Sequence, residues 1–216
     1  MPRQNRVTPR GETVAVPERG TLMGNRGCLH DAKEQIRRPW QLERWIVCVL
    51  AFKGRKRRVM TPGHYTELFF LDEATALAAG HRPCAECQRG RFNAFRRALV
   101  AGGAKGDEPL RSAVEIDRRL HAERVAPDRS KRTYTANLDE LPDGVFVFIS
   151  GRTDSTFLVL GDALLAWTAG GYTARIERPR EIVVNVLTPE LTVGAIRGGY
   201  VPALHPTASQ LLDRRT

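Results

Sequence analysis

The stretch FFLDEATALAAGHRPCAECQ, residues Phe69–Gln88, contains the clearest local structural signals in the chain. Asp72 suits the N-cap of a helix, and Glu73 places an acidic side chain in its first turn. Gly80 suits the position just after the helix, and Pro83 marks a break. The apolar positions between these ends fall at helical spacing, at Ala74, Leu77 and Ala78. The stretch therefore predicts a strand, a short helix and a turn that leads into the next element.

Two cysteines follow that break. Cys84 and Cys87 form a C-x2-C pair, and this spacing at a helix start lets both thiolates turn toward one ion. A tetrahedral zinc site needs two further ligands, and Cys28 and His30, in a glycine-containing loop, are the nearest candidates. Other candidates are Cys48, His64 and His81. We assign Cys48 to the core because it lies inside the apolar run WIVCVL. The predicted metal ligands are Cys28, His30, Cys84 and Cys87.

Residues 69–88 resemble the C-terminal half of the Ada-type zinc-binding domain of bacterial DNA methylation repair proteins. His81 stands where that family has an aromatic residue. The matching positions are Glu73-Ala74, Ala78-Ala79-Gly80, Arg82-Pro83-Cys84 and Cys87. In the family four cysteines bind one zinc ion, and the first pair is usually C-x3-C, whereas Cys28-Leu29-His30 is C-x-H. The resemblance implies zinc binding and DNA binding. Because the first pair differs from that of the family, we do not expect the family's methyl-transfer reaction.

Elements predicted outward from this stretch indicate an α+β protein in two parts. Residues 1–20 lack periodicity and predict a flexible arm, residues 21–100 an Ada-like zinc module, and residues 108–216 a mixed module of several strands with a closing helix. The predicted strands are 45–52, 65–71, 144–149, 156–160, 163–167 and 181–187. The predicted helices are 72–80, 84–100, 109–125 and one starting at 188–190.

The positive charge of the chain is concentrated in its first half. The net charge is +10, and residues 1–105 hold 20 basic against 9 acidic residues, whereas residues 106–216 hold 14 against 15. Such asymmetry favours an anionic partner, most often nucleic acid. A basic surface that serves only solubility is the alternative. The predicted nucleic-acid-binding residues are Lys53, Arg55, Lys56, Arg57, Arg58, Arg82, Arg89 and Arg91.

Composition restricts the class of protein. Hydrophobic residues make up 42% and charged residues 27% of the 216 residues, which is typical of a globular protein. The longest apolar runs fall short of a membrane span, and the N-terminus has no apolar segment of the secretory type. We therefore expect a cytoplasmic protein without a membrane partner.

The sequence predicts a zinc-binding protein that binds nucleic acid, most simply DNA, through a basic face, in DNA repair or regulation. The alternative is a zinc-dependent enzyme, either a hydrolase or a zinc-thiolate alkyl acceptor, if the ion has an open position. A protein–protein adaptor is a third interpretation. No residue shows a pattern that identifies it as catalytic.

Overall fold

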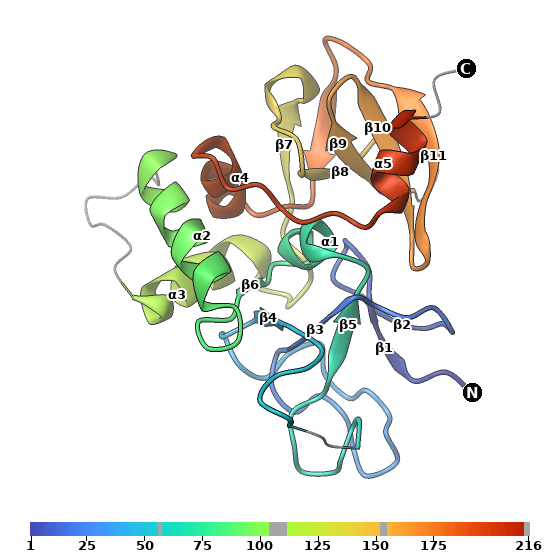
Figure 1. Cartoon of the computed structure of the whole chain (residues 1–216), viewed down its shortest axis with the longest axis vertical. Helices are drawn as coiled ribbons and strands as arrows, with labels where there is room; N and C mark the ends of the chain where they lie inside the picture. The colour runs from blue at the N-terminus through green and yellow to red at the C-terminus, as the bar shows by residue number, and fades with distance from the viewer. Residues whose placement is uncertain (56–57, 104–111, 152–154, 214–216) are drawn as a thin grey trace.

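The computed structural model describes residues 1–55, 58–103, 112–151 and 155–213. Within these ranges the chain forms helices and two six-stranded sheets, so the predicted α+β class is confirmed. Figure 1 shows the first sheet near the N-terminus, the second near the C-terminus, and α1 between them. Among the described residues, no helix combines the length and apolar character needed to cross a bilayer.

The first sheet is mixed and has the order β2-β1-β5-β3-β4-β6. β1 pairs with β5 and β4 pairs with β6 in parallel, and the other neighbours are antiparallel. Its strands are β1 (Gln4–Val7), β2 (Thr13–Ala15), β3 (Leu22–Asn25), β4 (Ile46–Cys48), β5 (Leu68–Phe70) and β6 (Arg82–Pro83). Residues 1–20, expected to form a flexible arm, thus supply the edge strand β2 and its neighbour β1. The pairing of β1 with β5 buries Val7 in the core of this sheet.

The second sheet is antiparallel throughout, with the order β11-β10-β9-β8-β12-β7. Gly161 has a φ of +58° in the tight turn between β9 and β10, which correspond to the predicted strands 156–160 and 163–167. Its strands are β7 (Tyr134–Asn137), β8 (Phe146–Phe148), β9 (Phe157–Leu160), β10 (Ala163–Thr168), β11 (Gly171–Glu177) and β12 (Val183–Val186). β7 and β11 were not predicted, because both are rich in polar residues.

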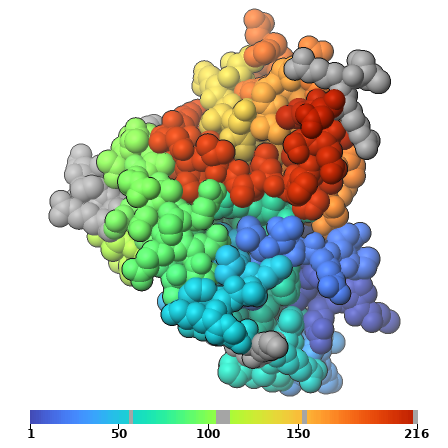
Figure 2. Space-filling model, viewed as in Figure 1, coloured from blue at the N-terminus to red at the C-terminus, as the bar shows by residue number. Residues whose placement is uncertain are grey.

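The helices fill the space beside and between the sheets. The predicted helix starting at residue 84 instead begins at Arg89, after a turn that holds the C-x2-C pair, and residues 109–111 of another predicted helix lie outside the described residues. The helices are α1 (Glu73–Ala78), α2 (Arg89–Ala101), α3 (Ala113–Arg124), α4 (Glu190–Arg197) and α5 (Thr207–Asp213), with a short 3-10 turn η1 (Leu138–Glu140). In Figure 2 the C-terminal segment, in red, runs across one face between α2 and the second sheet.

Helix α1 is buried on every side because each of its faces packs against a different core. Ala74 and Ala78 contact the second sheet, Ala76 contacts the first, and Leu77 contacts α2, α3 and α4. Small side chains suit this position because they allow three layers to approach one helix. The predicted cap is confirmed, since the Asp72 carboxylate accepts a hydrogen bond from the Thr75 amide at 2.8 Å.

The chain leaves α1 through a left-handed glycine. Gly80 has a φ of +91°, and a Cβ there would lie 2.6 Å from Cδ of Arg124. Glycine therefore satisfies both the turn and the close approach of α3. Arg124 of α3 donates to the Gly80 carbonyl at 2.7 Å, and the Arg82 guanidinium binds Asp117 of α3. Helix α3, expected to open the second module, thus packs directly on the first.

Candidate metal centre

Two short parallel strands bring the first two cysteines together. β4 and β6 pair with Val47 opposite Pro83, so the next residue along each strand is a cysteine. The Cys84 amide donates to the Val47 carbonyl at 2.9 Å, which fixes the two chains at this point. Because the two strands run in the same direction, Cys48 and Cys84 lie at the same end of the strand pair.

The third cysteine is delivered by the turn that precedes α2. The Gln88 amide donates to the Cys84 carbonyl at 3.1 Å and closes the turn. The Gln88 side chain donates to the Val47 carbonyl at 2.9 Å and holds the turn against β4. Within the turn the Glu86 amide donates to Sγ of Cys84 at 3.4 Å. The arrangement directs Cys87 back toward the other two sulfurs.

The three sulfurs of Cys48, Cys84 and Cys87 all lie within 4.8 Å of one another. Cys48 and Cys84 are buried and Cys87 is half-buried. A hydrogen bond from Cys48, aided by the backbone amides of Cys87 and Glu86, holds the pKa of the Cys84 thiol below its ordinary value. Burial raises the pKa of Cys87. A set of three thiols with one favoured thiolate can hold a metal ion, and thiolates suit ions with an affinity for sulfur.

The predicted ligands Cys28 and His30 do not belong to this cluster of the described residues. Both ring nitrogens of His30 are occupied, Nδ1 by the Thr66 hydroxyl at 2.6 Å and Nε2 by the Thr61 carbonyl at 3.2 Å. Sγ of Cys28 lies 3.7 Å from the His30 carbonyl. Polar side chains in this loop therefore serve to tie it to residues 61–66.

Cys48, the third cysteine of the cluster, is the one that the sequence analysis assigned to the core. It is buried, as expected of a cysteine in an apolar strand, and it is also close to the C-x2-C pair. The two roles are compatible because β4 ends at Cys48. The sequence carries no signal for this position, because the apolar run continues to Phe52, beyond the end of β4.

The predicted basic residues fall into two groups. Lys53, Arg55 and Arg58 are exposed in the loop after β4, and Arg89 is exposed at the start of α2. Lys56 and Arg57 lie outside the described residues. The Arg55 guanidinium pairs with the Glu86 carboxylate at 2.8 Å, so the basic loop is attached to the turn between Cys84 and Cys87.

Arg82 is buried and Arg91 half-buried, and both pair with buried carboxylates. Arg82 is buried and forms a two-pronged ion pair with Asp117, at 2.8 and 2.7 Å. Arg91 pairs with the buried carboxylate of Glu73 and donates to the Val201 carbonyl at 2.9 Å. Because Arg82 is buried and Arg91 is held by a buried carboxylate, we omit both arginines from the candidate nucleic-acid surface.

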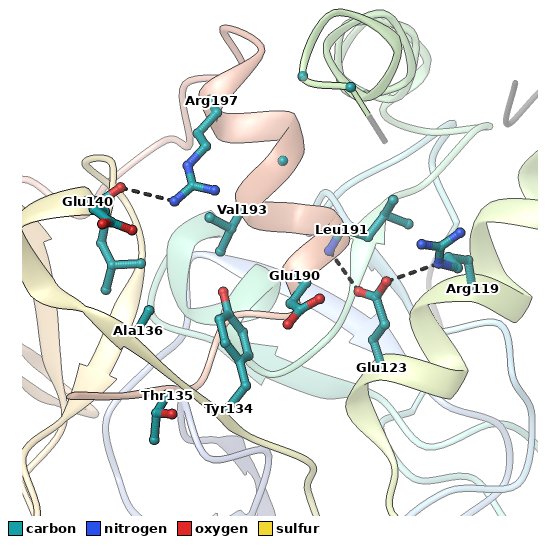
Figure 3. A pocket seen from close by; sticks show the side chains of 14 residues that line it. Arg119, Glu123, Tyr134, Thr135, Ala136, Glu140, Glu190, Leu191, Val193 and Arg197 are labelled. Atoms are coloured by element: carbon teal, nitrogen blue, oxygen red, sulfur yellow. Dashed lines mark hydrogen bonds and ion pairs between the residues drawn. The ribbon is translucent and has the colours of Figure 1, made fainter. Parts of the chain in front are cut away.

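A cavity of about 310 Å³ lies between α3, α4 and β7 (Figure 3). The Glu123 carboxylate accepts hydrogen bonds from the Leu191 amide at 2.7 Å and from Arg119 at 3.1 Å. Arg197 donates to the Glu140 carbonyl at 3.1 Å. These contacts join the helices to each other and to the second sheet, so the charges have structural partners.

No family model matches the chain, and neither a curated protein nor a solved structure matches it.

Proposed function

We propose that this protein binds zinc through Cys48, Cys84 and Cys87 and binds nucleic acid through the basic loop beside them, in DNA repair or regulation. The observation that carries the proposal is the ion pair between Arg55 and Glu86, because Glu86 lies between two of the three cysteines. A metal ion that orders this turn also fixes the attachment point of the basic loop.

Zinc suits the donor set. Zinc sites in proteins are built from thiolate and imidazole ligands in tetrahedral geometry, and a structural ion contributes folding free energy directly. The resemblance of residues 69–88 to the Ada-type zinc-binding domain supports the same assignment, with Cys48 taking a role that the sequence analysis gave to Cys28 and His30.

Metal analysis of purified variants tests the first half of the proposal. We expect wild-type protein to contain one zinc ion per chain and Cys48→Ser to contain far less. Cys28→Ser is the matched control, because Cys28 is a free cysteine outside the cluster. Equal zinc content in all three proteins, or none in the wild type, contradicts the metal assignment.

Salt-dependent binding to short DNA tests the second half. Phosphate contacts release counterions, so each lost contact lowers the slope of log K against log salt by about 1. We expect Lys53→Ala with Arg58→Ala to lower the slope by about 2 and to weaken binding of all sequences alike. Arg180→Ala is the control, since this exposed arginine pairs with Asp139 beside the second sheet. Equal effects of both changes exclude the loop as the binding surface.

The second candidate function is a zinc-thiolate alkyl acceptor, which the number of thiols favours. Three cysteines, rather than four, cluster within the described part of the chain, so one position of a tetrahedral ion is open to another ligand. Cys87 is the most accessible of the three thiols. In this reaction its sulfur forms a bond to the alkyl carbon while the leaving oxygen departs with the bonding electrons. Mass spectrometry after incubation with an alkylated phosphotriester DNA tests it, and an unmodified Cys87 excludes it.

A further inference from the structure

Two arginines pack against the indole of Trp45, and Lys131 lines the same cavity. Arg26 and Arg124 are 2% and 1% exposed, and the guanidinium carbon of each lies 4.2 Å from the Trp45 ring centroid. Lys131 is partly buried beside them. A Cβ on Gly11 would lie 3.8 Å from Nη2 of Arg26 and 4.0 Å from Cδ of Lys131, so these two side chains approach the same point.

Every hydrogen bond that these three cations donate goes to a neutral acceptor. Arg26 donates to the Gly11 carbonyl at 2.9 Å and to Nε2 of His81 at 3.2 Å. Lys131 donates to the Ala78 carbonyl at 2.7 Å. The other contacts of Arg26 and Arg124 are to the carbonyls of Pro39, Gly80 and Glu43 and to Nδ1 of His121. Carbonyl dipoles orient a buried cation but do not neutralise it.

The nearby carboxylates do not supply the missing charge. Asp117 is bound at both oxygens by Arg82. Glu12 lines the same cavity as an exposed side chain, and Glu43 reaches Arg124 only through its backbone carbonyl. Among the described residues, no carboxylate lies within ion-pair distance of Arg26, Arg124 or Lys131. Burial accordingly lowers the pKa of each arginine to about 9 and that of Lys131 to about 7.

The cations face a cavity of about 300 Å³. Among the residues that line it, three buried donors have no partner: Nη2 of Arg26, Nε of Arg124 and the indole Nε1 of Trp40. Arg10 and Arg129 also line the cavity, so five cationic side chains surround it against the single carboxylate of Glu12. Buried donors are normally satisfied, and buried charges are normally paired.

We propose that this cavity binds a phosphate group, presented as a phosphate monoester or as free phosphate. Among the described residues, the fold provides a carboxylate for buried Arg82 but none within ion-pair distance of Arg26, Arg124 or Lys131, so a bound ligand would supply their counter-charge. A phosphate dianion supplies two charges and several acceptor oxygens to guanidinium donors. The arginine–indole contacts offset part of the burial cost but contribute no net negative charge. This proposal stands independently of the metal centre.

Calorimetry and tryptophan fluorescence with inorganic phosphate as the probe test the proposal. We expect saturable binding that shifts the emission, because Trp40 and Trp45 both line the cavity. Lys131→Met should weaken binding about tenfold or more, as expected for loss of one charge-assisted hydrogen bond. Glu12→Gln should tighten binding severalfold, since it removes the opposing charge from an exposed position. The charge-matched control, Arg180→Met, should leave binding unchanged.

The source of the phosphate is read from three further titrations. Tighter binding of adenosine 5′-monophosphate than of inorganic phosphate, with no binding of adenosine, supports a mononucleotide. Tighter binding of a 5′-phosphorylated than of an unphosphorylated oligonucleotide supports a strand end. Free phosphate as the tightest ligand supports the inorganic ion. Absence of saturable binding of every phosphate compound, or unaltered affinity in both Lys131→Met and Glu12→Gln, overturns the proposal.

Discussion

Replacing buried Arg82 with methionine should strongly lower the free energy of unfolding while leaving the exposed basic residues unchanged. The Arg82 side chain is 2% exposed, and its partner Asp117 is 8% exposed. Burial raises the pKa of Asp117 even though the Arg82 guanidinium beside it favours the ionised form. Arg82→Met removes two short hydrogen bonds and leaves the carboxylate buried without its cation.

The size of the effect follows from this burial. Removing one partner of a buried ion pair costs about 3–5 kcal/mol of unfolding free energy. For a chain of this size that corresponds to a melting temperature lower by about 6–20 °C. Arg89→Met is the matched control, because Arg89 is exposed on the same segment, and it should change the unfolding free energy by less than about 0.5 kcal/mol.

Urea unfolding followed by circular dichroism measures both values. A double variant, Arg82→Met with Asp117→Leu, separates loss of the pair from loss of packing. Because replacing both partners with apolar groups is often neutral, we expect it to recover most of the lost stability. A single variant as stable as the wild type, or a double variant no more stable than Arg82→Met, would refute this account of the pair.

Three further changes test the packing of the fold. Gly198→Ala should lower the free energy of unfolding in urea by about 1–3 kcal/mol, because the added Cβ would meet a backbone carbonyl of α2 at 2.0 Å. A Cβ on Gly90 would meet open space, so the control Gly90→Ala should stabilise α2. Tyr172→Phe should cost about 1.5–3 kcal/mol by removing a 2.7 Å hydrogen bond to the buried Asp72 carboxylate, measured by thermal unfolding, and an unchanged midpoint contradicts this role. Burial, with nearby arginines, keeps the pKa of His81 well below its ordinary value, so in mildly acidic solution the imidazole is protonated in the unfolded chain only. As the pH falls below about 6.5, the free energy of unfolding should therefore decrease by up to about 1.4 kcal/mol per pH unit. His81→Gln should remove that contribution, and an identical pH profile would contradict it.

The sequence predicted those parts of the fold that local chemistry determines. Helix α1 begins after the N-cap Asp72 and ends before the left-handed Gly80, as expected, because both signals act within one turn of the helix. β1, the edge strand β2 and the polar strand β11 were missed. Only β1 has a partner that is distant in the sequence, β5, whereas β2 and β11 pair with the strands that directly precede them. An alternating pattern is weak in strands this short or this polar.

The candidate metal site was predicted in part for the same reason. The C-x2-C pair is local, and Cys84 and Cys87 do lie close together. The nearby Cys48 arrives through the parallel pairing of β4 with β6, which no spacing in the sequence reveals. His30 had the right chemistry, but the hydroxyl of Thr66 and the carbonyl of Thr61 occupy its nitrogens.

The parallel strands β4 and β6 have one more consequence. Trp45, which lines the proposed phosphate cavity, and His81, which contacts Trp45 and Arg26, immediately precede the two strands. Cys48 and Cys84 lie at the other ends of these strands. Three residues of extended chain span about 10 Å, so the two short strands connect the proposed phosphate cavity to the cysteine cluster. If binding at either proposed site shifts these strands, the two sites are thermodynamically coupled. Phosphate must then change the affinity for zinc by the same factor by which zinc changes the affinity for phosphate.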